Sequence, residues 1–309
     1  MPTASEIKAQ VARESERRSR IAVPAFAGGV LYLLSGIITA STLNGAPTVG
    51  LIQGLAPALS GVANPAVSPR ATEVKFVSHH AFALIAGSAL AAIAIGALTL
   101  ILLLLLDATR FRRPEMWSAA GPLILAGGIG VALVSLGHQV VSSIETHSFA
   151  VGHDFSNHAV DNALTKGTAN VATEYLALLA GLALAAGMIA VMLNAMRAGL
   201  LTRWMGMLGI FTGVLIFLPL GGATLEIVPA FWMVMMGILF VGRWPNGDPP
   251  AWAAGEARPW PSQAEMRAKR SGQGQPALST AAADLAPAPA RPTPNGPSRK
   301  RRRKRGARR

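Results

Sequence analysis

Six long apolar stretches, separated by polar segments, constrain this chain more than any other feature of its sequence. They cover 21–41, 80–106, 117–138, 174–196, 203–220 and 223–241. An α-helix rises about 1.5 Å per residue, so about 20 apolar residues cross roughly 30 Å of hydrocarbon. So many apolar stretches leave too little polar surface for a water-soluble domain. The sequence therefore predicts an all-α fold, a polytopic transmembrane helix bundle with six spans.

Basic residues on alternate sides of these stretches predict the orientation of the bundle. Arginines and lysines are frequent in 1–20, 107–116, 197–203 and 243–309, whereas the opposite segments carry only Arg70, Lys75 and Lys166. Basic residues close to the ends of spans are retained in the cytoplasm. We therefore expect a cytoplasmic N-terminal segment at 1–20, a six-span domain at 21–242 and a cytoplasmic tail at 243–309.

Composition narrows the cellular setting and the available chemistry. The chain has no cysteine, which excludes disulfides, thiolate metal sites and cysteine nucleophiles. Its many alanines, glycines and arginines are typical of bacteria with GC-rich genomes, so we expect a multi-pass protein of a bacterial plasma membrane. Small residues four positions apart, such as Ala92 with Gly96 and Ala126 with Gly130, favour close contact between helices.

The tail divides into a tryptophan- and proline-rich part and a basic part. Trp244, Trp252 and Trp260 predict a segment that runs along the inner membrane surface, and the low complexity of 262–297 predicts disorder. The last part contains Arg299, Lys300, Arg301, Arg302, Arg303, Lys304, Arg305, Arg308 and Arg309. These residues supply nine of the net thirteen positive charges. Such a cluster is attracted to anionic lipid, and binding to the ribosome or another polyanion is an open alternative.

Histidines on the opposite side of the bundle are candidate metal ligands. The candidates are His79, His80, His138, His153 and His158. Imidazoles with nearby carboxylates can bind a transition metal, and two facing imidazoles can ligate haem. His80 and His138 are expected at similar depth, at the outer ends of neighbouring spans. An ordinary interfacial role is the alternative, because no His-Glu-x-x-His motif occurs.

Two glutamates mark a candidate ion or proton site. Glu226 lies near the outer start of the last apolar stretch, and Glu174 opens the fourth. A carboxylate in hydrocarbon normally faces a partner or a water-filled cavity. If both glutamates face the bundle interior, they predict a site for a cation or a proton.

The search for catalytic signatures finds neither a phosphate-binding loop nor a nucleophile elbow. We therefore expect a non-catalytic binding or accessory component of the membrane. One alternative is a small transporter, or an ion- or proton-responsive protein, that uses the outer histidines and glutamates. A second alternative is a haem- or metal-binding redox protein. The sequence leaves open a protein partner and a homo-oligomer.

Overall fold

A computed structural model describes residues 3–61, 67–218, 226–245 and 247–260 of the chain. These residues form helices and their connections, and the only β-type pairing among them is an isolated bridge between Val67 and Phe155. The all-α prediction is therefore confirmed for the described residues. The predicted disorder of the tail lies outside them.

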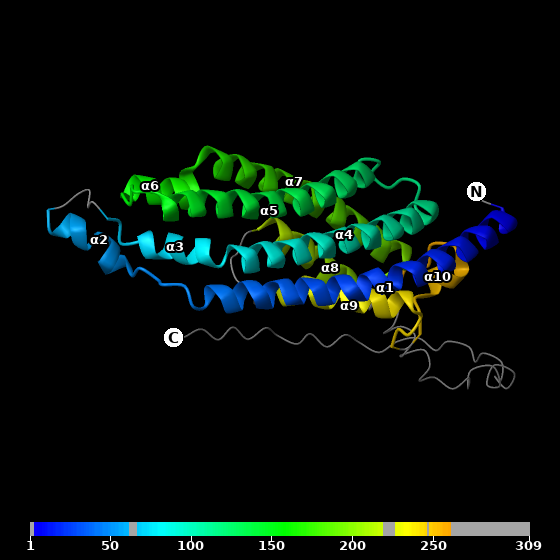
Figure 1. Cartoon of the computed structure of the whole chain (residues 1–309). Helices are drawn as coiled ribbons and strands as arrows, with labels where there is room; N and C mark the ends of the chain where they lie inside the picture. The colour runs from blue at the N-terminus through cyan, green and yellow to red at the C-terminus, as the bar shows by residue number, and fades with distance from the viewer. Residues whose placement is uncertain (1–2, 62–66, 219–225, 246, 261–309) are drawn as a thin grey trace, which may run out of the picture. The chain divides into compact units, whose positions relative to one another are not determined.

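The helices follow one another along the chain as shown in Figure 1. They are α1 (Ala4–Leu43), α2 (Leu51–Leu59), α3 (Ala71–His79), α4 (Ala81–Arg112), α5 (Ala120–Val151), α6 (Asn157–Asp161), a π-helical turn (Asn162–Lys166), α7 (Thr168–Ala198), α8 (Arg203–Phe217), α9 (Ile227–Phe240) and α10 (Pro250–Ala254).

Four helices, α1, α4, α5 and α7, are long and apolar enough to cross a membrane. They correspond to the first four predicted spans. The apolar helices α8 and α9 contain 15 and 14 residues, which gives each a length of roughly 22 Å. The turn predicted between them lies outside the described residues. Four membrane-length helices are thus established, and the six-span count stays a prediction.

Helix α1 extends far beyond the predicted span at 21–41 and includes nearly all of the N-terminal segment. It contains 40 residues, about 60 Å of helix. A capping box fixes its start: the side chain of Thr3 accepts a hydrogen bond from the backbone of Glu6, and the Glu6 carboxylate accepts one from the backbone N–H of Thr3. The basic residues before the span are therefore held on a rigid helix.

The two ends of the bundle differ in composition. The histidine end comprises α2, α3, α6 and the adjacent ends of α4, α5 and α7. There α5 continues to Val151 instead of ending at residue 138, and the residues Leu51–Leu59 form α2. The basic end comprises the first turns of α1, the α4–α5 and α7–α8 turns, and residues 241–245 and 247–260. The start of α1, the end of α4 and helix α10 meet at the basic end (Figure 1).

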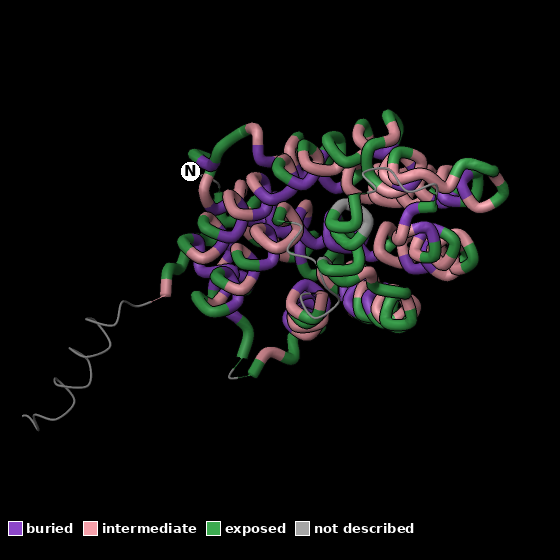
Figure 2. Tube along the Cα trace, turned by 90° about the vertical axis from the view of Figure 1, so that its left-hand side faces the viewer, coloured by how far each residue is buried: buried purple, intermediate pink, exposed green. Residues whose placement is uncertain are grey.

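Small residues allow the long helices to approach closely. Buried positions lie where helices face one another, and exposed positions point away (Figure 2). A Cβ added to Gly127 of α5 would lie 2.3 Å from the backbone nitrogen of Leu184 in α7, and one added to Gly130 would lie 2.8 Å from the Cβ of Ala180. Gly96 of α4 has nothing within 4 Å of such a Cβ. Pairs of small residues four positions apart therefore lie at helix contacts in some cases and on open surface in others.

Candidate functional site

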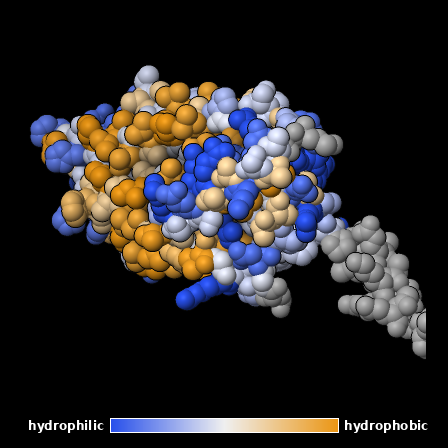
Figure 3. Space-filling view, turned by 90° about the vertical axis from the view of Figure 1, so that its right-hand side faces the viewer, coloured by the Kyte–Doolittle hydropathy of each residue, from blue (hydrophilic) through white to orange (hydrophobic). Residues whose placement is uncertain are grey.

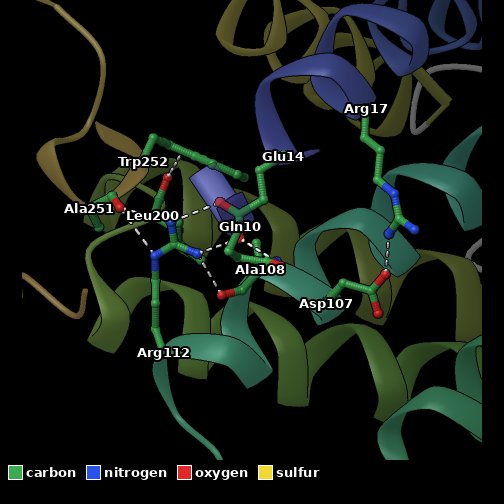
Figure 4. Close-up of polar contacts among 9 residues, drawn as sticks. All are labelled: Gln10, Glu14, Arg17, Asp107, Ala108, Arg112, Leu200, Ala251 and Trp252. Carbon is green, nitrogen blue, oxygen red and sulfur yellow. Dashed lines mark hydrogen bonds and ion pairs between the residues drawn. The ribbon is translucent and has the colours of Figure 1, made fainter. Parts of the chain in front are cut away.

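A buried ion pair joins α1 to α4 at the basic end. Nη1 and Nη2 of Arg112 each lie 2.8 Å from one carboxylate oxygen of Glu14. The side chains are 0% and 4% exposed. This two-point contact is the strongest geometry available to an arginine and a carboxylate. Figure 4 shows the two side chains pointing toward each other.

The remaining polar groups of the pair are also satisfied. Arg112 donates from Nε and Nη2 to the carbonyl of Ala251, at 3.1 and 2.9 Å, and from Nη1 to the carbonyl of Ala108, at 2.9 Å. Gln10 donates to Glu14 over 3.0 Å. A buried charge is tolerated when its partners satisfy it in this way. Because Ala251 belongs to α10, Arg112 holds the chain after the last long helix against the bundle.

The local sequence explains the positions of Arg112, Glu14 and the start of α10. Arg112 is the last residue of α4, where a cation interacts favourably with the helix dipole. Glu14 lies on the part of α1 that precedes its long apolar stretch. Pro250 begins α10 at a position where proline is favoured, since its missing N–H has no helical partner there.

Trp252 of α10 packs against two arginines. The guanidinium carbon of Arg18 lies 4.6 Å from the centre of its ring, and that of Arg112 lies 5.7 Å away. The indole N–H donates to the carbonyl of Leu200 over 2.9 Å. Arg18 also pairs with Asp248 at 2.8 Å. The ring therefore ties α10 to α1, α4 and the α7–α8 turn.

The chain after α10 crosses the α7–α8 turn. Gly199 ends α7 with a φ of +78°, a conformation that glycine adopts without steric cost. A Cβ at Gly199 would lie 1.9 Å from the carbonyl oxygen of Arg258. The backbone N–H of Arg258 donates to Ala198 over 3.0 Å, and the indole N–H of Trp260 donates to Leu201 over 2.8 Å. Backbone hydrogen bonds and tight contact thus fix this segment in place.

The tryptophan- and proline-rich segment packs against the α7–α8 turn, and its course along the membrane surface stays a prediction. Trp252 is buried, Trp260 is partly buried, and both indole N–H groups bond to backbone carbonyls of the α7–α8 turn. On the face of the molecule at the basic end, hydrophilic residues gather in the centre and on the right, and hydrophobic residues cover the left side (Figure 3). The hydrogen bonds to the carbonyls of Leu200 and Leu201 make this segment part of the folded bundle.

The structure places the candidate histidines on several different elements. His79 and His80 lie at the junction of α3 and α4, with ring centres 5.3 Å apart. His80 contacts the carbonyl of Phe76, and His138 contacts the hydroxyl of Thr173. In the described part of the chain, no three histidine or acidic side chains converge on one point suited to a metal ion. The metal site stays a prediction.

The expected equal depth of His80 and His138 is not observed. In the antiparallel pair of α4 and α5, Gly121 faces Leu106 and Gly128 faces Thr99. This register separates the levels of His80 and His138 by roughly nine residues, or about 13 Å of helix rise. The sequence suggested equal depth because α5 was expected to end at residue 138.

The two glutamates occupy different environments. Glu174 is exposed on α7. Glu226 precedes α9, and its carboxylate occupies the space that Gly36 of α1 leaves free. One oxygen of Glu226 is buried without a hydrogen-bond partner among the described residues. The structure shows no contact between the two carboxylates, and an ion or proton site stays a prediction.

A pocket at the histidine end has a volume of about 530 Å³. It is lined by Glu145, Ser148, Phe149, Gly152, His153, Asp154, Ala159, Asn162, Ala163, Lys166, Gly167 and Thr168. The backbone N–H of Ser156 bonds to Asp154 and lowers the pKa of that carboxyl. Among the candidate histidines, only His153 lines the pocket. His158 instead contacts Asn162, 3.1 Å away.

Comparison of the chain with protein-family models, curated proteins and solved structures found no match. A functional assignment therefore depends on the arrangement of its own residues. Sequence reasoning missed the most highly organised group, Glu14, Arg112 and Trp252. Its only sequence signal is a glutamate and an arginine beside long apolar stretches.

Proposed function

We propose that this protein is a non-catalytic membrane anchor that presents its arginine-rich tail to anionic lipid at the cytoplasmic face of a bacterial plasma membrane. In this proposal the bundle crosses the membrane six times, with the basic end inside. Two features support that count: α8 and α9 lead the chain back to the basic end, and basic residues concentrate there.

The observation that carries the proposal is the attachment of residues 248–260 to the bundle. Arg112 binds the carbonyl of Ala251, and Trp252 and Trp260 bind the carbonyls of the α7–α8 turn. These contacts fix the point at which the tail leaves the bundle. A tail that starts at a fixed point beside the membrane has a high effective concentration at the lipid surface.

The charge of the tail is suited to anionic lipid. Each basic residue near an anionic surface contributes about 1 kcal/mol to binding. The cluster from Arg299 to Arg309 has no aromatic residues among its arginines and lysines, so it lacks groups that stack on bases. Lipid therefore fits the sequence of the tail better than single-stranded RNA does.

Replacing Arg301, Arg302 and Arg303 with glutamine tests this proposal. The full chain is placed in nanodiscs of neutral lipid, and its binding to separate vesicles containing phosphatidylglycerol is measured by sedimentation. We expect the triple variant to bind roughly 100-fold more weakly, since three lost charges correspond to about 3 kcal/mol. Binding should also weaken as salt is raised.

The matched control replaces the same three arginines with lysine and should bind the vesicles almost as well as the wild type. Equal binding of the wild type and the glutamine variant would contradict the proposal. So would binding of RNA under conditions in which anionic vesicles are not bound.

A further inference from the structure

A second pocket lies at the basic end, where α7 turns into α8. Its volume is about 360 Å³. It is lined by Leu193, Met196, Arg197, Arg203, Met207, Pro259 and Trp260. Two guanidinium groups and an indole ring thus share a hollow with apolar side chains. Neither Glu14 nor Arg112 lines this pocket.

The two arginines in this pocket have no acidic partner among the described residues. Arg197 and Arg203 form no ion pair with any carboxylate in the described ranges, whereas Arg17, Arg18, Arg112 and others do. Arg203 is also the first residue of α8, where a cation is unfavourable to the helix dipole. Helix stability therefore gives no reason for a cation at this position.

The pocket wall is built from a distant part of the chain. Trp260 is held by its bond to Leu201, and the neighbouring Arg258 is held against Gly199. Pro259 lies between these two fixed residues and lines the pocket. Hydrogen bonds between residues about 60 positions apart therefore secure this wall of the pocket.

The apolar part of the pocket continues onto the flank of the bundle. Leu193 and Met207 are 38% and 65% exposed. In a membrane, exposed apolar side chains on apolar helices face the acyl chains. Arginine and tryptophan at the ends of the same helices lie at the level of the headgroups.

We propose that this pocket binds one anionic phospholipid, with the headgroup phosphate between Arg197 and Arg203 and an acyl chain along Leu193 and Met207. The guanidinium groups of Arg197 and Arg203 form no ion pair within the described residues, and they supply charge and hydrogen-bond donors for the phosphate. Trp260 closes the headgroup side. Basic pockets between membrane helices at the cytoplasmic surface bind acidic headgroups in this way.

The test uses the purified, delipidated full chain in mild detergent. It is mixed with phosphatidylglycerol or with phosphatidylcholine of the same acyl chains, and bound lipid is counted by native mass spectrometry. We expect the wild type to retain one phosphatidylglycerol in preference to phosphatidylcholine. The double variant Arg197→Gln/Arg203→Gln should bind that lipid at least about tenfold more weakly, a change of about 1.4 kcal/mol.

The variant Arg13→Gln/Arg243→Gln is the matched control. It removes two exposed arginines outside this pocket and should keep the bound lipid. Any lipid attracted to the tail is the same in all these proteins, so the difference reports on the pocket alone. Glycerol phosphate without acyl chains should not displace the lipid, which distinguishes a phospholipid site from a free phosphate site.

A variant that leaves both arginines in place guards against an effect of misfolding. Met207→Trp fills the apolar part of the pocket and should also lower retention of phosphatidylglycerol. Thermal unfolding of each variant without lipid checks that the bundle is intact. Equal retention of the two lipids by the wild type, or unchanged retention by both pocket variants, would overturn the proposal.

Discussion

Replacing Arg112 with methionine is expected to destabilise the folded protein by about 3–5 kcal/mol. The substitution leaves Glu14 as a buried carboxylate without its partner. It also removes both donors to the carbonyl of Ala251, so α10 loses its attachment to α4. Equilibrium unfolding by denaturant in mixed micelles measures the change in the free energy of unfolding.

Two further variants separate charge burial from the other effects of the substitution. Glu14→Leu combined with Arg112→Met removes both charges together, so the double variant should recover most of the lost stability. Arg17→Gln breaks the exposed pair with Asp107 and should cost less than about 1 kcal/mol. The interpretation fails if Arg112→Met costs no more than Arg17→Gln.

Replacing Gly127 with alanine is expected to destabilise the bundle by about 1–3 kcal/mol. The added Cβ would lie 2.3 Å from the nitrogen and 2.7 Å from the Cα of Leu184. These are backbone atoms, so α5 and α7 must move apart to relieve the overlap. The loss of close packing along the two helices should appear as a lower free energy of unfolding in the same assay.

Gly96→Ala provides the same chemical change at an open position. Nothing lies within 4 Å of a Cβ at Gly96, and alanine is favoured over glycine inside a helix by roughly 0.5–1 kcal/mol. This variant should therefore be as stable as the wild type or more stable. Similar losses at Gly96 and Gly127 would show that α5 and α7 are not in close contact.

Much of the fold follows from local sequence. Long apolar stretches predicted the four membrane-length helices. The predicted helix ends were less accurate, because α1 and α5 continue through polar residues that carry no hydrophobic signal. Thr3 and Glu6, by contrast, formed a capping pattern that could have indicated the true start of α1.

The candidate site was much harder to predict, because its residues meet only in the folded chain. Glu14 and Arg112 are separated by 98 positions, and neither belongs to a recognisable motif. Tryptophan is a residue type favoured at membrane interfaces, yet contacts with Leu200 and Arg18 bury Trp252. The histidines show the opposite error: their proximity in sequence suggested a cluster, and helix register separates His80 from His138.

The most direct test of the proposed membrane orientation uses single cysteines, since the chain contains none of its own. Ala253→Cys lies exposed at the basic end, and Ser148→Cys lies exposed at the histidine end. Each variant is treated in cells with a maleimide that cannot cross the plasma membrane. We expect Cys at position 148 to react in intact cells, and Cys at position 253 to react only after permeabilisation. Labelling of position 253 in intact cells would contradict a cytoplasmic basic end.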